Sequence, residues 1–186
     1  MSMVTWPDHL LTLAEWEAMP ADTTHLVELV EGVLLVAPRP AFLHQRVMAR
    51  LATELDRQLP DNLAASPDVE VLIDAGFPPT VRVPDVVVVP TPVADRNPAR
   101  VEAADVVLAV EIVSPGTGRT DRVTKLKEYA DAGIGHYWIV DLDPPVSLTG
   151  YLLVAGDYEV MIEGAGVVEV GTPAPLRIDL DLLFRR

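Results

Sequence analysis

Two carboxylates lie in stretches of sequence that are otherwise typical of buried strands. Asp85 is followed by four valines, and Glu111 lies within the apolar run from Leu108 to Val113. Burying a carboxylate without a partner is costly, so each acid requires a cation, a metal ion or hydrogen-bond donors. One shared divalent ion would satisfy both acids. Backbone amides or arginines as donors are the alternative.

An amine follows these carboxylates at helical spacing. Asp121, Lys125 and Tyr129 are spaced four apart, which places them on one face of a helix. The chain has two lysines, Lys125 and Lys127, beside twelve arginines, and a lysine supplies a more compact cation than an arginine. We expect Lys125 to reach the strand carboxylates. The alternative is a solvated lysine paired with Asp121.

The elements that must position these residues follow from the hydrophobic pattern. Apolar, β-branched runs bounded by Pro, Gly or Asp predict strands over Asp68 to Ile73, Val81 to Val89, Val106 to Val113 and His136 to Val140. Pro84 interrupts the second of these, and residues 90–104 are predicted to form a loop. Thr120 as N-cap and Gly133 as C-cap bound a helix over roughly 121–132.

The pattern also predicts elements on both sides of this core. Thr12 and Glu15 have the spacing of a capping box, which predicts a short helix ending near Met19. Apolar residues that recur every four positions predict a long helix over 41–59. Further strands are predicted as a hairpin of Val27–Val30 with Val33–Val36 across Glu31-Gly32, and as short antiparallel strands at Tyr151–Leu153, Glu159–Ile162 and Val167–Val170.

Length and composition narrow the class of protein. At 186 residues with 49% hydrophobic content, the chain suffices for one substantial core and is short for two, so we expect one domain over residues 1–186. The absence of cysteine excludes disulfides, cysteine-type zinc sites and thiol nucleophiles, and it is compatible with a reducing compartment. Valine-rich strands together with helices predict an α/β (α+β) protein.

No segment resembles a targeting signal or a membrane span. Met1 to Leu13 carries Asp8 and His9 and lacks a basic region followed by a long apolar run, so it does not resemble a signal peptide. No stretch approaches the roughly 18 uninterrupted apolar residues of a membrane helix. We therefore expect a soluble, cytoplasmic protein without a membrane partner.

The charge balance is strongly acidic. Fourteen basic and 28 acidic residues give a net charge of −14. Proteins that bind nucleic acid without sequence specificity usually present a basic face, because the release of counterions from phosphates supplies most of their affinity. A nucleic-acid substrate would therefore require metal ions, or a local concentration of basic residues, to offset this charge.

Six motifs in order make the chain resemble the Uma-type restriction endonuclease family over roughly residues 10–160. They are Glu28-Leu29-Val30-Glu31-Gly32, His44 near the start of the long helix, Pro84-Asp85, Glu111-Ile112-Val113-Ser114-Pro115, Asp121-x-x-x-Lys125-x-x-x-Tyr129 and Tyr137-Trp138-Ile139-Val140-Asp141. Each motif alone is weak, and the six in this order are specific.

The resemblance implies a PD-(D/E)XK nuclease with a restriction-endonuclease-like core: a mixed sheet flanked by helices, with an N-terminal hairpin and C-terminal antiparallel strands. In the common form of the motif the lysine lies two residues after the acid, where this chain has Val113. In the family that it resembles, the lysine has moved to the following helix, which Lys125 matches. If Lys125 does not point at Asp85 and Glu111, catalytic competence is in doubt.

The resemblance and the chemistry of phosphodiesters imply roles for these residues. Asp85, Glu111 and the Ile112 carbonyl are expected to bind Mg²⁺, with Mn²⁺ as the alternative ion. Lys125 would orient the attacking water or stabilise the oxyanion. Glu28 would position the water shell of the metal, and His44 would contact phosphate or transfer a proton.

The implied function is a magnesium-dependent endonuclease that hydrolyses phosphodiester bonds in DNA. A homodimer is expected, because two related sites are the simplest way to cut both strands. Two alternatives stay open: a catalytically inactive protein of the same fold that serves as a binding or regulatory module, and a nuclease that acts on RNA.

Overall fold

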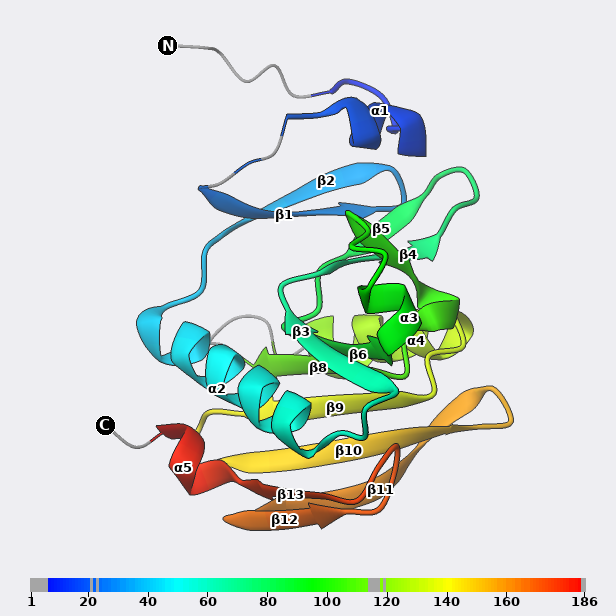
Figure 1. Cartoon of the computed structure of the whole chain (residues 1–186). Helices are drawn as coiled ribbons and strands as arrows, with labels where there is room; N and C mark the ends of the chain where they lie inside the picture. Colours follow the sequence, from blue (N-terminus) through cyan, green and yellow to red (C-terminus); the bar gives the residue numbers. More distant parts are fainter. Residues whose placement is uncertain (1–6, 21, 23, 114–117, 119, 185–186) are drawn as a thin grey trace.

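Three β-sheets and the helices that pack against them make up the computed structural model (Figure 1). The structure describes residues 7–20, 22, 24–113, 118 and 120–184. Residues 1–6 of the segment expected not to be a signal peptide lie outside this part, as do Ser114 and Pro115 of one family motif. Within the described part, no helix is long and apolar enough to cross a membrane.

The largest sheet has six strands in the order β11-β10-β9-β8-β6-β3. Their bounds are β3 Leu63–Pro67, β6 Val86–Pro90, β8 Leu108–Val113, β9 His136–Asp141, β10 Ser147–Val154 and β11 Asp157–Ala165. Strands β8 and β9 are parallel, and the other neighbouring strands are antiparallel. The sheet is therefore mixed, as the fold class predicted.

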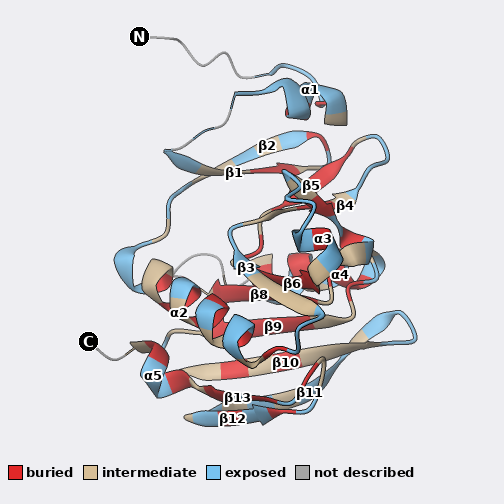
Figure 2. Ribbon diagram, viewed as in Figure 1, coloured by how far each residue is buried: buried red, intermediate tan, exposed pale blue. Residues whose placement is uncertain are grey.

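Helices cover both faces of the central strands of this sheet. Val86 and Val88 pack with helix α2 (Phe42–Gln58), whereas Val87 and Val89 pack in a second cluster that includes Tyr129 of helix α4 (Leu126–Asp131). Strands covered on both faces lose the alternation of polar and apolar residues. In Figure 2 these central strands are accordingly coloured as buried along most of their length.

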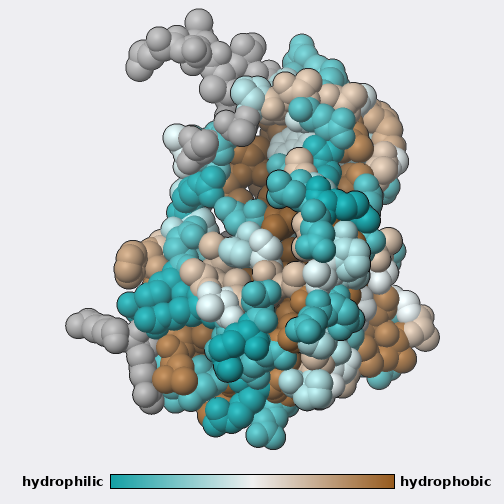
Figure 3. All heavy atoms as spheres, viewed as in Figure 1, coloured by the Kyte–Doolittle hydropathy of each residue, from teal (hydrophilic) through white to brown (hydrophobic). Residues whose placement is uncertain are grey.

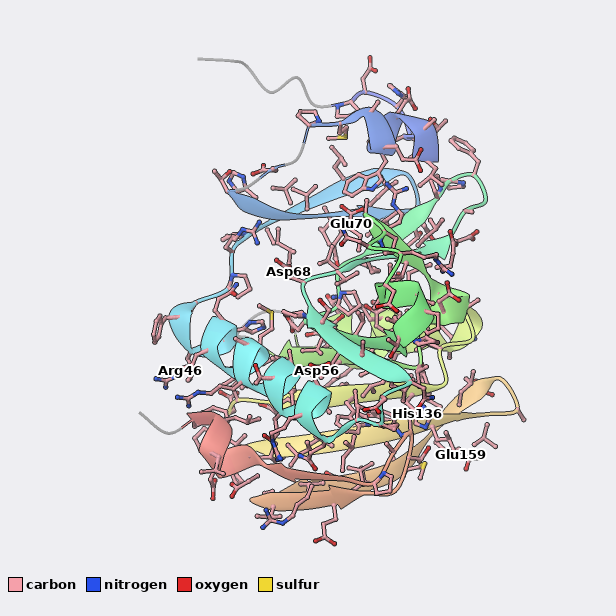
Figure 4. The ribbon with its side chains drawn as sticks, viewed as in Figure 1. Arg46, Asp56, Asp68, Glu70, His136 and Glu159 are labelled. Atoms are coloured by element: carbon pink, nitrogen blue, oxygen red, sulfur yellow. The ribbon has the colours of Figure 1, made fainter. Side chains whose placement is uncertain are left out.

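Helix α2 has one apolar side and one polar side. Its buried residues are His44, Val47, Met48, Leu51, Ala52 and Leu55. In Figure 3 hydrophilic side chains cover much of the outer side, whereas Phe42 at the start of the helix is an exposed apolar residue. Asp56, labelled in Figure 4, accepts a hydrogen bond of 3.2 Å from Ala65 N of β3, so the end of the helix is tied to the sheet. The predicted helix over 41–59 is confirmed.

A smaller five-stranded sheet lies on the N-terminal side, in the order β2-β1-β5-β4-β7. Its strands are β1 His25–Val30, β2 Val33–Pro38, β4 Glu70–Asp74, β5 Thr80–Arg82 and β7 Arg100–Glu102. The predicted hairpin is confirmed: Val30 pairs with Val33 across Glu31 and Gly32, both with positive φ. The predicted capping box of Thr12 and Glu15 is also present, on helix α1 (Leu13–Ala18).

The predicted strand over Val81–Val89 is wrong as a single element. It consists of β5 in the smaller sheet and β6 in the larger sheet, separated at Pro84. Proline lacks an N–H for a strand ladder, so the chain changes sheets at this position. Asp85 consequently lies between the two sheets.

Other differences concern short elements. The predicted loop over 90–104 contains helix α3 (Thr91–Ala94), strand β7 and the start of a 3-10 turn, η1 (Ala103–Asp105). Strand β3 was not predicted, because its sequence, Leu-Ala-Ala-Ser-Pro, contains no β-branched residue. The helix predicted over 121–132 begins with a π-helical segment, η2 (Thr120–Lys125), and continues as α4.

The C-terminal region is antiparallel, as predicted, with longer strands than expected in β10 and β11. A separate two-stranded sheet pairs β12 (Val167–Val170) with β13 (Leu176–Asp179). Strand β13 and helix α5 (Leu180–Phe184) were not predicted. Both contribute to the core cluster that α2 forms with the large sheet.

Candidate active site

Glu111 lies on β8 and faces helix α4, on the same side of the sheet as Ala109. Its side chain is almost fully buried. Two donors meet at one oxygen of its carboxylate: Lys125 Nζ lies 2.9 Å from Oε1, and the Tyr129 hydroxyl donates to Oε1 at 2.7 Å. The predicted contact between Glu111 and Lys125 is therefore present in the structure.

Lys125 is surrounded by carboxylates. Besides Glu111, its Nζ lies 3.4 Å from Glu28 Oε1 and 3.8 Å from Asp121 Oδ1. It is the last residue of the π-helical segment η2, and such segments occur frequently at functional sites. The lysine predicted as catalytic is thus buried and does not point into solvent.

Asp85 approaches the backbone next to Glu111. Its Oδ2 accepts a hydrogen bond of 2.6 Å from Ile112 N. His44 Nε2 lies 3.2 Å from the same oxygen and 3.0 Å from the Ile112 carbonyl oxygen. Both neighbours of Nε2 are acceptors, so this nitrogen carries a proton and donates. Burial would lower the pKa of His44, but its hydrogen bond to Asp85 raises it above the ordinary value.

Glu28 enters the site from β1 of the smaller sheet. Arg82 Nη1 donates to its Oε2 at 2.9 Å, and Val83 N donates to its Oε1 at 3.0 Å. Burial would raise the pKa of Glu28, but Lys125 and Arg82 hold it below the ordinary value. Glu28 is therefore an ionised partner of the lysine, although a glutamate beside a hairpin is ordinarily exposed.

Within the part of the chain that the structure describes, three carboxylates converge on one lysine. Glu28, Glu111 and Asp121 contact Lys125, and Asp85 contacts His44 and the Ile112 amide. Arg82 is shared between Glu28 and Glu128. Burial raises the pKa of Glu111 to about 8; Lys125 opposes this shift and the neighbouring carboxylates reinforce it. Burial would lower the pKa of Lys125, but the carboxylates raise it, so the ammonium stays charged.

The chemistry of the donor atoms on Asp85, Glu111 and Ile112 suits a magnesium ion. Two carboxylates and the Ile112 carbonyl are hard oxygen ligands, and a divalent cation would offset the surplus of negative charge. Among the described residues, no three His, Asp or Glu side chains form a group that could hold a metal ion. Such a site would therefore depend on two carboxylates, one carbonyl and water.

The structure brings the residues proposed from the sequence into two adjoining groups. Asp85 and His44 contact the Ile112 backbone, and Glu111 and Glu28 contact Lys125. Among the described residues, no contact joins Lys125 to Asp85. Asp121, Tyr129, Arg82 and Glu128 also belong to this network and were not proposed as site residues. For Asp121 and Tyr129 the signal was present, since both share the helix face of Lys125.

Comparison with known proteins identifies the fold and the family. A solved structure from Anabaena variabilis, described as a "putative nuclease belonging to DUF820", aligns with a TM-score of 0.71 and 21% identity, over 94% of this chain and 97% of that one. At that identity the likeness shows the fold. A search of curated proteins gave no match. The model of the Uma2 family, described as "Putative restriction endonuclease", matches residues 13–175. The chain therefore belongs to the Uma2 family.

Proposed function

We propose that this protein is a magnesium-dependent endonuclease that hydrolyses phosphodiester bonds in DNA. The observation that carries the proposal is the 2.9 Å contact between Lys125 Nζ and Glu111, with Asp85 bonded to the next backbone amide. Three carboxylates meet the amine in a buried cluster, and Asp85 lies next to it at the Ile112 amide, so the cluster holds more carboxylates than its lysine can neutralise. Membership of the Uma2 family supports the nuclease class.

The roles proposed for the side chains follow from their positions. Asp85, Glu111 and the Ile112 carbonyl would hold the ion, which when bound supplies the Lewis acidity that activates water and offsets phosphate charge. Lys125 keeps its proton, so it would orient the attacking water or stabilise the developing oxyanion by donating a hydrogen bond.

Two further residues would assist from opposite sides of the cluster. Glu28 would hold the Lys125 ammonium and orient water around the ion, since its Oε1 lies beside Nζ. His44 carries a proton on Nε2 next to Asp85. It would contact a substrate phosphate or transfer a proton.

Cleavage of supercoiled plasmid tests the proposal. Wild-type protein with Mg²⁺ or Mn²⁺ should convert the plasmid to nicked or linear forms, and both EDTA and Asp85→Ala should abolish cleavage. Arg96→Ala, which alters an exposed ion pair with Asp105, is the matched control and should cleave like wild type. Cleavage of RNA alone would identify an RNA nuclease, and cleavage of neither would favour a binding or regulatory module.

The assembly and the compartment are part of the same proposal. We propose a homodimer, because two sites related by a twofold axis could cut both strands; sedimentation of the wild-type protein with a DNA duplex would measure it. We propose a cytoplasmic location, since a chain without cysteine suits a reducing compartment.

A further inference from the structure

Arg82 is a buried cation that the proposed chemistry does not use. Its side chain is 2% exposed and bridges two carboxylates from different parts of the fold. Nη1 donates to Glu28 at 2.9 Å, while Nε and Nη2 donate to the two oxygens of Glu128 at 2.8 and 2.7 Å. This paired geometry is specific to arginine, because a lysine has no planar fork of donors.

The bridge connects the segments that carry the candidate catalytic groups. Glu128 lies three residues after Lys125 on the same helical segment, and Arg82 lies three residues before Asp85. Through Glu28, whose Oε1 contacts Lys125 Nζ, the bridge closes a ring of contacts from α4 to β5, to β1 and back to η2. Each ion pair in this ring limits where the ammonium can lie.

We propose that Arg82 and Glu128 are positioning residues that hold Lys125 and Glu28 in register with Asp85 and Glu111. The expected effect on catalysis rests on the proposed function. The expected effect on the position of Lys125 rests only on the ring of contacts. The pair touches neither the proposed ligands of the metal nor Lys125 itself in any contact of the described residues. It acts through Glu28 and through the placement of α4.

A role in stability alone does not account for this arrangement. Replacing a buried ion pair by well-packed apolar residues is often neutral or stabilising, so burial of Arg82 gains little stability by itself. The two-point contact with Glu128, in contrast, fixes both the distance and the rotation of α4 relative to β5. A catalytic amine requires its position and direction to be fixed in this way.

Because the chain has only two lysines, NMR of labelled lysine can report on the surroundings of Lys125 itself. With [¹³C]lysine, the wild-type chain gives signals from Lys125 and Lys127 alone, and Lys125→Arg assigns them. Glu128→Ala is the main variant, because Glu128 is 22% exposed and tolerates truncation better than buried Arg82. Asp131→Ala, which removes an exposed carboxylate that binds Lys127 on the same helix, is the matched control. Arg82→Lys keeps the charge and loses the fork.

Two readouts are compared at one pH. Glu128→Ala and Arg82→Lys should shift the ¹Hε–¹³Cε signal of Lys125 and leave that of Lys127 in place, whereas Asp131→Ala should do the reverse. With magnesium and plasmid, Glu128→Ala should lower kcat by about 10- to 100-fold at nearly unchanged KM, the range found for outer-shell partners. Asp131→Ala should leave kcat unchanged.

The outcomes separate this inference from the proposed function. A folded Glu128→Ala variant with an unshifted Lys125 signal and wild-type kcat would overturn the positioning role. If wild-type protein cleaves no plasmid, the proposed function fails, and the lysine signals still decide whether the pair positions Lys125. If Arg82→Lys does not fold, the lysine signals and the kcat of Glu128→Ala alone show whether the Arg82–Glu128 pair positions Lys125.

Discussion

The helical segment η2–α4 carries two ion pairs of the same type and spacing in opposite surroundings. Asp121 and Lys125 are four residues apart, as are Lys127 and Asp131. The first pair is buried, with Lys125 8% exposed, and the second is exposed, with Lys127 64% exposed. The exposed pair is the shorter, at 2.5 Å against 3.8 Å. The distance within a pair therefore does not distinguish the pair that we propose to be functional; burial among further carboxylates does.

The largest expected difference between the pairs is catalytic. Lys125→Met should lower kcat for plasmid cleavage by about 10²- to 10³-fold, the usual cost of losing one donor to a developing charge. It should also cost about 3–5 kcal/mol of stability, because it leaves buried carboxylates without their cation. Lys127→Met, assayed by the same gel and melting curves, should match wild type. Equal kcat values for Lys125→Met and Lys127→Met would show that the buried lysine has no special role in catalysis.

A pH-dependent difference should be next in size. The pKa of Glu111 is about 8 in the folded protein against an ordinary 4.5. The folded state therefore binds this proton more tightly, and its contribution to stability is complete below 4.5 and lost as pH rises through 8. Glu111→Gln removes this loss, so it should be more stable than wild type by about 2–5 kcal/mol above pH 8.

Melting temperatures of wild type and Glu111→Gln from pH 4 to 9 measure this effect. The advantage of the glutamine variant should grow as pH rises and be smallest at the acid end. A constant difference across the range would show that the carboxylate ionises at its ordinary pKa, and that the buried cluster is less strained by like charge than its contacts indicate.

Magnesium should stabilise the buried cluster by a smaller amount. At about 100 times the dissociation constant, a ligand that binds only the folded state adds about 2.7 kcal/mol. Wild type and Lys127→Met should therefore melt at a higher temperature with magnesium at pH 8, and Asp85→Ala should not. The same increase in Asp85→Ala would place the ion elsewhere.

The smallest effect is expected at the exposed pair itself. Asp131→Asn removes a carboxylate that solvent and salt already screen. Its melting temperature and kcat should equal those of wild type at 0.1 M salt and higher. A measurable loss of activity would give the outer face of α4 a function that its exposure does not suggest.

The sequence identified the carboxylates of the site better than their supporting residues. Asp85 and Glu111 are conspicuous, because an acid within an apolar strand needs a partner. Arg82 and Glu128 are not, since charged residues beside a proline or on a short helix usually face solvent. The four-residue spacing of Asp121, Lys125 and Tyr129 and the resemblance to a family together favoured Lys125 over Lys127.

Similar limits apply to the fold. Periodic segments such as α2 and the β1–β2 hairpin were predictable, because their patterns extend over many residues. The division of Val81–Val89 between two sheets was not, since local sequence shows that Pro84 interrupts a strand but not where each half pairs. Strand β3 and the C-terminal α5 depend on contacts with α2 that no local pattern encodes.

The change of sheet at Pro84 has a mechanical consequence. Three hydrogen bonds start within the four residues 82–85. Arg82 donates to Glu128 of helix α4, Val83 N donates to Glu28 of β1, and Asp85 accepts from Ile112 N of β8. A rotation of one sheet against the other would have to stretch one of these bonds. A change in the orientation of the N-terminal sheet would therefore alter the distance between Asp85 and Glu111. A distortion of the β1–β2 hairpin would change the geometry of these carboxylates.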